Sequence, residues 1–195
     1  MKIYLIPIMA MFFAGCASTS TQIHRMSERT TLCNAGEDLG YVAVLPETAW
    51  RVNQKEPAKR ERMALEEIQK AFEGFPCGKL SAPGGIRKFD KWSIKSEAEL
   101  LKEFSKEGVD TIIIIRMEEL TPLLYIAFSL PFLWGAANEA DFSIKMLSVK
   151  TGDVLLDMHV KRITGGPFEL RPSEWSRKEL RTALHDIIGG LTPTR

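Results

Sequence analysis

The sequence predicts an α/β (α+β) fold: a single mixed sheet of about four or five strands packed by three helices, behind an amino-terminal signal and a flexible tether. Three observations support this class. They are two short apolar runs, three stretches with apolar residues at helical spacing, and two alternating segments around a tight turn. No internal repeat divides the 195 residues, so we expect one folded domain over residues 32–195.

The two apolar runs predict the centre of the sheet. Residues 41–45 form a short run closed by Pro46, and residues 109–115 include four consecutive isoleucines. When both the odd and the even positions of a strand are apolar, especially with β-branched residues, the pattern favours a strand covered on both faces. Both segments are therefore expected to be buried strands.

An antiparallel hairpin is predicted nearer the carboxyl terminus. Its first strand alternates apolar and polar residues from Phe142 to Met146. Residues 150–153, Lys-Thr-Gly-Asp, form a tight reversal in which Gly152 can take positive φ. On the return strand we expect an inward and an outward set: Leu156, Met158 and Val160, and Asp157, His159 and Lys161.

Three helices are predicted to pack on this sheet, over residues 57–75, 96–107 and 173–188. Ser96 and Glu99 have the spacing of a capping box, and Gly108 is well placed just beyond the end of the second helix. Residues 80–92 are ambiguous between a loop and a short edge strand. The last helix is expected to bury one stripe of apolar side chains: Leu180, Leu184, Ile187 and Ile188.

The composition excludes several classes of function. The 26 Lys and Arg residues against 25 Asp and Glu leave no excess charge to hold a nucleic acid. A content of 45% hydrophobic and 9% aromatic residues is typical of a core-forming chain. Three cysteines are too few for a cysteine-rich scaffold or a four-cysteine zinc site.

The amino terminus follows the plan of a bacterial signal peptide. Lys2 precedes an apolar run over residues 3–13, and residues 14–16, Ala-Gly-Cys, resemble the lipobox of bacterial lipoproteins. The resemblance implies that residues 1–15 are removed and that Cys16 is acylated, with palmitate among its lipids. An ordinary secretory signal and a short membrane anchor are the alternatives.

The residues around this cysteine bear on its destination. Phe13 departs from the lipobox pattern, which usually has Leu there. Ala17 follows the cysteine, and the resemblance to enteric-type lipoproteins then implies the outer membrane, whereas Asp would favour the inner one. Residues 16–31 are rich in Ser and Thr without a hydrophobic period, which predicts a flexible tether with the domain in the periplasm.

Two cysteines remain once Cys16 is acylated. In an oxidising compartment Cys33 and Cys77 are best explained as a disulfide. Two separate buried thiols are the alternative, because sequence does not fix the geometry of a bridge.

The order of elements, with the segments VAVLP, GVDTIIII and LSVKTGDVLLD, resembles a periplasmic α/β domain shared by several envelope lipoproteins. These are the curli secretion-channel family, the lipoprotein of the Pel polysaccharide exporter, lipoprotein activators of penicillin-binding proteins, and the amino-terminal domain of the Tol-Pal propeller protein. The resemblance covers about residues 40–190 and marks a fold rather than a function. It implies an adaptor or ring-forming channel part, and it supplies no catalytic residue.

An uncharged segment between the predicted strands, residues 120–138, is the most hydrophobic part of the chain outside the signal. Pro122, Pro131 and Gly135 argue against a transmembrane helix. A buried helix or loop, a surface for a partner or a second copy, and a membrane-dipping element remain open. The candidate contact residues are Leu123, Leu124, Tyr125, Ile126, Phe128, Leu130, Phe132, Leu133 and Trp134.

No catalytic or metal-binding constellation is predicted. The three histidines lack metal-ligand spacing, and Asp157 with His159 on one strand face is more simply a solvated surface. A modest basic patch, diluted by Glu174 and Glu179, is expected around the last helix from four residues: Arg171, Arg177, Lys178 and Arg181. The predicted function is a non-enzymatic scaffold or adaptor of an envelope assembly, export or cell-wall machine, without a cofactor and with outer-membrane lipid and an envelope protein or a second copy as partners. A cell-envelope hydrolase with an unrecognised active site is the alternative.

Overall fold

The described part of the computed structural model, residues 18–52, 56–81, 85–126, 134–167 and 174–189, contains six strands and three α-helices. The elements in chain order are β1 (Ser18–Arg25), β2 (Tyr41–Thr48), α2 (Pro57–Ala71), β3 (Lys79–Leu80), the short 3₁₀ helix η1 (Trp92–Ile94), α3 (Glu97–Lys106), β4 (Thr111–Ile126), β5 (Trp134–Ser148), β6 (Val154–Pro167) and α4 (Glu174–Gly189). None of the helices in these ranges is long and apolar enough to cross a membrane.

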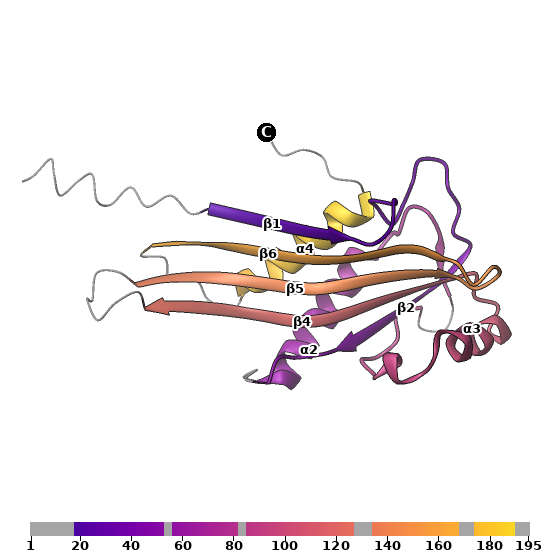
Figure 1. The fold of residues 1–195 in the computed structure, drawn as a ribbon, viewed down its shortest axis with the longest axis horizontal. Helices are drawn as coiled ribbons and strands as arrows, with labels where there is room; N and C mark the ends of the chain where they lie inside the picture. Colours follow the sequence, from indigo (N-terminus) through magenta and orange to yellow (C-terminus); the bar gives the residue numbers. More distant parts are fainter. Residues whose placement is uncertain (1–17, 53–55, 82–84, 127–133, 168–173, 190–195) are drawn as a thin grey trace, which may run out of the picture.

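The strands form one mixed sheet in the order β1-β6-β5-β4-β2-β3 (Figure 1). β2 is parallel to β3 and β4, and all other pairs are antiparallel. The predicted mixed α/β class with three helices is confirmed. The sheet has six strands rather than the expected four or five, because the edge strands β1 and β3 were not both foreseen.

The centre of the sheet is buried on both faces, as the isoleucine run predicted. Ile113 and Ile115 pack with residues of α2 and α4, whereas Ile112 packs on the opposite face with Leu100 and Phe104 of α3. The ribbon view shows α2 and α4 side by side behind the sheet, with α3 at one end (Figure 1). The predicted stripe of α4 is buried in full: Leu180, Leu184, Ile187 and Ile188.

A buried charge joins the two helices behind the sheet. Glu67 of α2 is fully buried and accepts hydrogen bonds from Arg177 Nε at 3.0 Å and Arg181 Nε at 2.5 Å, both on α4. Burial alone would raise the pKa of Glu67, but the hydrogen bonds from Arg181 and Arg177 outweigh it and the pKa is lowered. The predicted basic patch is therefore wrong in part, because two of its arginines hold α4 against α2.

The capping box and the hairpin turn have the predicted geometry. Ser96 Oγ accepts from the Glu99 backbone amide, while the Glu99 carboxylate accepts from the Ser96 amide at 2.8 Å. Gly108 follows α3 with φ of 72°, and Gly152 in the β5–β6 turn has φ of 78°. Positive φ at both positions favours glycine, which has no Cβ.

The amino-terminal segment differs from the predicted tether. Ser18–Arg25 forms β1, which pairs antiparallel with β6 from Ser18–Gly165 to Arg25–Met158. An edge strand needs only backbone partners and one anchoring side chain, so its Ser- and Thr-rich sequence shows no hydrophobic period. Ile23 provides that anchor by packing against the core. The folded region therefore includes β1 and does not begin near Leu32.

The described parts of the apolar segment, residues 120–126 and 134–138, belong to the sheet rather than to a helix or loop. β4 continues to Ile126 and β5 begins at Trp134, with pairing from Thr111–Ser148 to Ile126–Trp134. Pro122 is accommodated because β2 ends opposite Met117, so that beyond this point β4 has β5 as its strand neighbour in the described sheet. Pro46 is accommodated in β2 for the same reason. β3 pairs only with Tyr41 and Val42, so at Pro46 no β3 residue requires the amide hydrogen that proline lacks.

Candidate functional site

Charged side chains gather on the sheet face opposite α2 and α4, beyond the part covered by α3. Four carboxylates and three basic or imidazole groups converge there from β4, β5, β6 and the chain after β2. We call this set the charged row, and its members are Arg51, Glu118, Glu119, Glu139, Asp141, His159 and Lys161.

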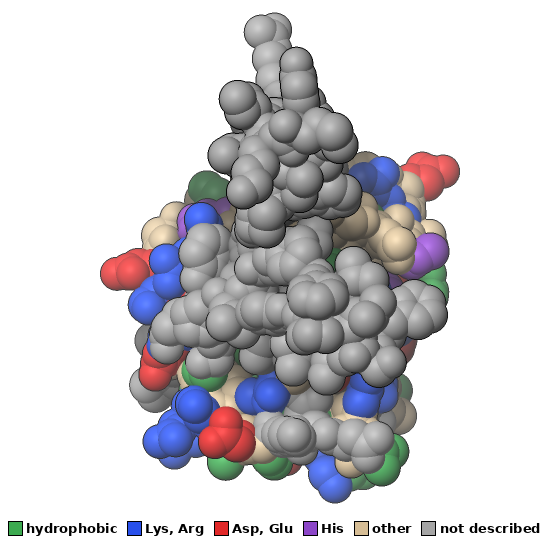
Figure 2. Space-filling view, turned by 90° about the vertical axis from the view of Figure 1, so that its left-hand side faces the viewer, with side chains coloured by type: hydrophobic (Ala, Val, Ile, Leu, Met, Phe, Trp, Pro, Cys, Tyr) green, Lys and Arg blue, Asp and Glu red, His purple; other side chains and the backbone are tan. Residues whose placement is uncertain are grey.

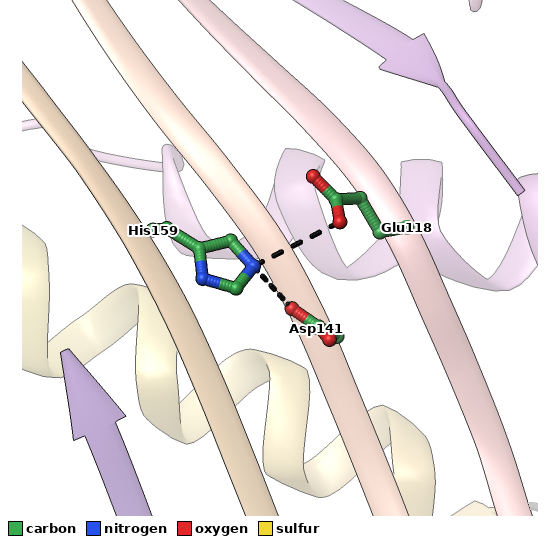
Figure 3. A group of neighbouring side chains, drawn as sticks. All are labelled: Glu118, Asp141 and His159. Carbon is green, nitrogen blue, oxygen red and sulfur yellow. Dashed lines mark ion pairs between the residues drawn. The ribbon is translucent and has the colours of Figure 1, made fainter. Parts of the chain in front are cut away.

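Three members of the charged row point toward a common spot (Figure 3). His159 Nε2 lies 2.6 Å from Asp141 Oδ1 and 3.8 Å from Glu118 Oε2. His159 is paired in register with Ser143, so its ring reaches diagonally to Asp141 on the neighbouring strand. Glu118 is the extra residue of a register shift between Met117 and Glu119, and such a β-bulge can re-aim a side chain.

The carboxylates of this row are unusually buried for acidic groups on a sheet. Asp141 and Glu139 are each 2% exposed and Glu119 is 6% exposed. Buried carboxylates are unfavourable unless they are paired, and two of these carboxylates, those of Asp141 and Glu139, each pair with a cation. Arg51 Nη2 donates to Asp141 Oδ2 at 2.6 Å, and Lys161 Nζ lies 2.8 Å from Glu139 Oε1.

Arg51 responds to this surrounding negative charge. Partial burial would lower the pKa of its guanidinium, but the charges of Glu139, Asp141 and Glu119 outweigh that effect and raise it. Arg51 therefore stays charged and fixes the orientation of the Asp141 carboxylate through one oxygen. The other oxygen, Oδ1, faces His159.

The chemistry available here is that of an imidazole and two carboxylates. Each of Glu118, Asp141 and His159 offers one atom suited to a metal ion, and these atoms lie within 4.8 Å of one another. The spacing of these residues along the sequence predicted no metal site. The fold brings them together from three strands.

A hollow of about 270 Å³ adjoins the charged row on the side of α3. Its wall includes Glu47 and Arg116 from the parallel strands, Lys145 from β5 and Asp157 from β6. Asp157 and His159 do share a face as predicted. The two do not form a pair, because Asp157 lines this hollow while His159 turns to Asp141.

The residues predicted from sequence to carry function are not members of the charged row. Cys33 and Cys77 form a disulfide, with their sulfur atoms 2.01 Å apart, as predicted. Cys16 lies outside the described residues, as do four of the nine predicted contact residues: Phe128, Leu130, Phe132 and Leu133. The backbone of the other five belongs to β4 or β5, and the contact prediction for their side chains stays a prediction: Leu123, Leu124, Tyr125, Ile126 and Trp134.

Figure 2 views the molecule from the end of the sheet where β4 ends and β5 begins. Lys, Arg, Asp, Glu and His side chains of the described residues intermingle around its rim (Figure 2). A rim of mixed sign does not have the character of a polyanion-binding surface. This agrees with the balanced charge of the sequence.

Sequence reasoning missed the Glu118–Asp141–His159 group because its members are separated by 18 or more residues. The alternation of the predicted hairpin placed His159 on the outward face but did not reveal its partner. The turn pairs Leu147 with Val154, and a register shift between Met146 and Leu147 then sets Ser143 opposite His159, with Asp141 on the same face one pair away. Nothing in the sequence indicates the bulge that adds Glu118.

No protein-family model and no curated protein matches this sequence. Among solved structures, the chain is similar to the PelC dodecamer from Paraburkholderia phytofirmans, with 11% identity, a TM-score of 0.47, and coverage of 87% of this chain and 98% of that one. It is also similar to lipoprotein GNA1162 from Neisseria meningitidis, with 10% identity, a TM-score of 0.38, and coverage of 77% and 99%. A putative neuraminyllactose-binding hemagglutinin homolog from Helicobacter pylori matches with 10% identity, a TM-score of 0.40, and coverage of 88% and 90%. Similarities at this level assign neither a family nor a function to the chain.

Proposed function

We propose that this chain is a lipid-anchored envelope protein whose periplasmic α/β domain serves as a scaffold or adaptor through protein contacts. The observation that carries the proposal is the arrangement of Lys2, the apolar run over residues 3–13 and Cys16. The Cys33–Cys77 disulfide supports it independently, because such bridges persist in oxidising compartments such as the periplasm.

The anchor is an acyl group on Cys16, with the outer membrane as its destination. Mass spectrometry of the mature amino terminus tests this directly, and the expected species is an acylated cysteine after loss of residues 1–15. Cys16→Ser should block processing or release the domain from the membrane fraction. A mature chain cut at another position and recovered without lipid would reject the anchor.

The strand register supports a further part of the proposal, namely which end of the domain would face the membrane. Ser18 pairs with Gly165, Gly165 pairs with Ala137, and Ala137 pairs with Leu123. Adjacent strands are about 4.8 Å apart, and the two residues from Cys16 to Ser18 span at most about 7 Å. A lipid on Cys16 would therefore hold the bilayer at the end of the sheet where β4 ends and β5 begins (Figure 1).

We accordingly propose that the predicted contact residues between Leu123 and Trp134 meet the bilayer, with self-association as the other possible use of the same surface. Leaving several of these side chains in water would cost several kcal/mol at about 25 cal/mol per Å². Tyr and Trp are also enriched at the membrane–water interface. Lipids brominated along their acyl chains should quench Trp134 fluorescence in vesicles that hold the acylated protein.

The matched comparison uses two single substitutions. Trp134→Phe should remove most of the quenching, whereas Trp92→Phe, at the α3 end of the sheet, should leave it in place. Quenching that survives Trp134→Phe would reject membrane contact. In that case a fall in particle mass on Phe128→Ser with Trp134→Ser, measured by analytical ultracentrifugation, would identify the surface as a contact between copies.

A cell-envelope hydrolase is the second candidate function, and the Glu118–Asp141–His159 group is the observation that favours it. Hydrolysis of purified cell-wall or lipid material that disappears in His159→Gln would establish this class. Equal release of products by the wild type and this variant would trace the activity to another source.

A further inference from the structure

We propose that Glu118, Asp141 and His159 form a binding site for a divalent transition metal ion on the exposed side of the sheet. The proposal is independent of the lipid anchor and of the scaffold function. It rests on three features: the convergence of three ligand atoms, the lack of a hydrogen-bond partner for two of these atoms, and the excess of carboxylates over cations around them.

The first feature is the convergence of one imidazole nitrogen and two carboxylate oxygens from three adjacent strands. The three ligand atoms lie within 4.8 Å of one another. Ligand atoms on a tetrahedral zinc ion, each about 2.1 Å from the metal, are about 3.4 Å apart. The 3.8 Å separation of His159 Nε2 from Glu118 Oε2 is close to that value, and the 2.6 Å separation from Asp141 Oδ1 reaches it by a small rotation of the imidazole.

The second feature is that two of these atoms are shielded from solvent without a well-formed hydrogen bond. Asp141 Oδ1 and His159 Nε2 face each other, but neither has a hydrogen-bond partner of acceptable geometry. Asp141 is 2% exposed, so this oxygen is a buried acceptor aimed into the site (Figure 3). A buried polar atom left in this way is unfavourable, and a bound cation would satisfy both atoms at once.

The third feature is an excess of negative charge. The carboxylates of Glu118, Glu119, Glu139 and Asp141 face the cations of Arg51 and Lys161, with Arg60 at 3.9 Å from Glu119 as a third. The four carboxylates outnumber these three cations by one. A metal ion at His159 supplies positive charge where it is lacking.

The surroundings also suit a metal site. Arg51 holds the second oxygen of Asp141 at 2.6 Å, which orients the carboxylate in the way that outer hydrogen bonds orient metal ligands. The side chains of His159 and Glu118 are 30% and 35% exposed, so an ion can enter and a coordination position stays open to water. Because imidazole favours zinc-like transition ions over Mg²⁺ and Ca²⁺, we assign the site to that class.

The test uses the full chain purified in detergent without a histidine tag, stripped with a chelator and titrated with Zn²⁺ by calorimetry. We expect one ion per chain and no comparable binding of Mg²⁺. His159→Gln should weaken Zn²⁺ binding more than about tenfold, because losing even a hydrogen-bond partner of a ligand costs about 10- to 100-fold. Glu118→Gln, a change at a partly exposed carboxylate, should weaken it in the same direction.

His24→Gln is the matched control. His24 lies across the β1–β6 pair from His159 with ring centroids 6.3 Å apart, but it is outside the ligand group. Its substitution should leave Zn²⁺ affinity within twofold of the wild type, and circular dichroism should show all three variants folded. The site is rejected if the wild type shows no saturable binding, if folded His159→Gln binds as tightly as the wild type, or if His24→Gln weakens binding as much as His159→Gln.

Discussion

The two ends of the sheet bury different kinds of side chain. Near α3, the strands bury aliphatic residues on both faces, as at Leu45, Ile112 and Ile113. Toward the far ends of β4, β5 and β6, the same strands bury polar and charged groups, among them Asn138, Glu139 and Asp141. A buried apolar group stabilises without a specific partner, whereas a buried charge needs one. The end near α3 therefore mainly stabilises the fold, whereas the end with buried charges is suited to binding a ligand.

The difference also separates two faces within one strand. Phe142 is fully buried against α2 and α4, while its neighbour Asp141 points to the opposite face and belongs to the charged row. Period-2 alternation makes such adjacent residues independent in their contacts. Substitutions at the helix-packed face should thus change stability, and substitutions in the Glu118–Asp141–His159 group should mainly change binding.

Phe142→Ala tests the helix-packed face and has the largest expected effect. Removing a fully buried phenyl ring leaves a cavity, and the free energy of unfolding should fall by about 3–5 kcal/mol. Urea unfolding followed by circular dichroism measures it. His159→Gln is the matched change on the other face and should alter stability by less than about 1 kcal/mol in metal-free buffer. Equal losses in the two variants would break the distinction between the faces.

The disulfide is expected to give the next largest effect. Cys33→Ala with Cys77→Ala removes a bridge across a sequence separation of 44 residues. The loop-entropy relation gives about 4 kcal/mol for such a closure, and measured bridges often give about 2–4 kcal/mol. Because Cys77 packs in the core that α2 and α4 cover, the loss should appear as lower stability of the whole domain. A denaturation midpoint unchanged by reduction of the wild-type protein would contradict this.

Sequence patterns predicted the helices and the hairpin turn better than the charged row, for physical reasons. The stripe of α4, the capping box at Ser96 and the turn at Gly152 are local, so a few neighbouring residues determine them. Both β1 and the Glu118–Asp141–His159 group depend on strand register and, for Glu118, on a bulge. The extension of β4 was missed because Pro122 and a long apolar run argue against a strand unless the neighbouring strand is known to have ended.

Glu67 is the exception on the face of the sheet that α2 and α4 cover, since it is a fully buried charge there. Glu67→Gln should lower the free energy of unfolding at pH 7 by about 1–3 kcal/mol, because Arg177 and Arg181 lose their charged acceptor. Glu67→Leu would distinguish charge from packing. A more stable Leu variant would mean that the clamp sets the pairing of α2 with α4 rather than adding stability.

The pH dependence of this clamp has a definite sign. The pKa of Glu67 is lower in the folded chain than its usual value of 4.5, so the unfolded chain binds the proton more tightly. The stabilisation from Glu67 is therefore complete above about pH 5 and is lost as the pH falls through the folded pKa. The difference in unfolding free energy between wild type and Glu67→Gln should shrink as the pH falls below about 5, because the folded chain must then take up the proton at a site where it binds less tightly. A difference that stays constant over this range would show that the carboxylate charge does not contribute.

The smallest expected effect concerns α3, the helix that packs on the face of the sheet opposite α2 and α4. Ser96 caps α3 by accepting from the Glu99 amide, so Ser96→Ala should cost about 1 kcal/mol. Ser105→Ala, at an exposed position on the same helix, should be neutral or slightly stabilising because alanine favours helix. Hydrogen exchange of the α3 amides should rise in Ser96→Ala while exchange in α4 changes less. Since α3 contacts the sheet through Leu100, Phe104 and the Glu97–Lys145 ion pair, and none of these residues belongs to the charged row, Zn²⁺ affinity should not change. A cap variant that weakened zinc binding would mean that the two ends are coupled through the sheet.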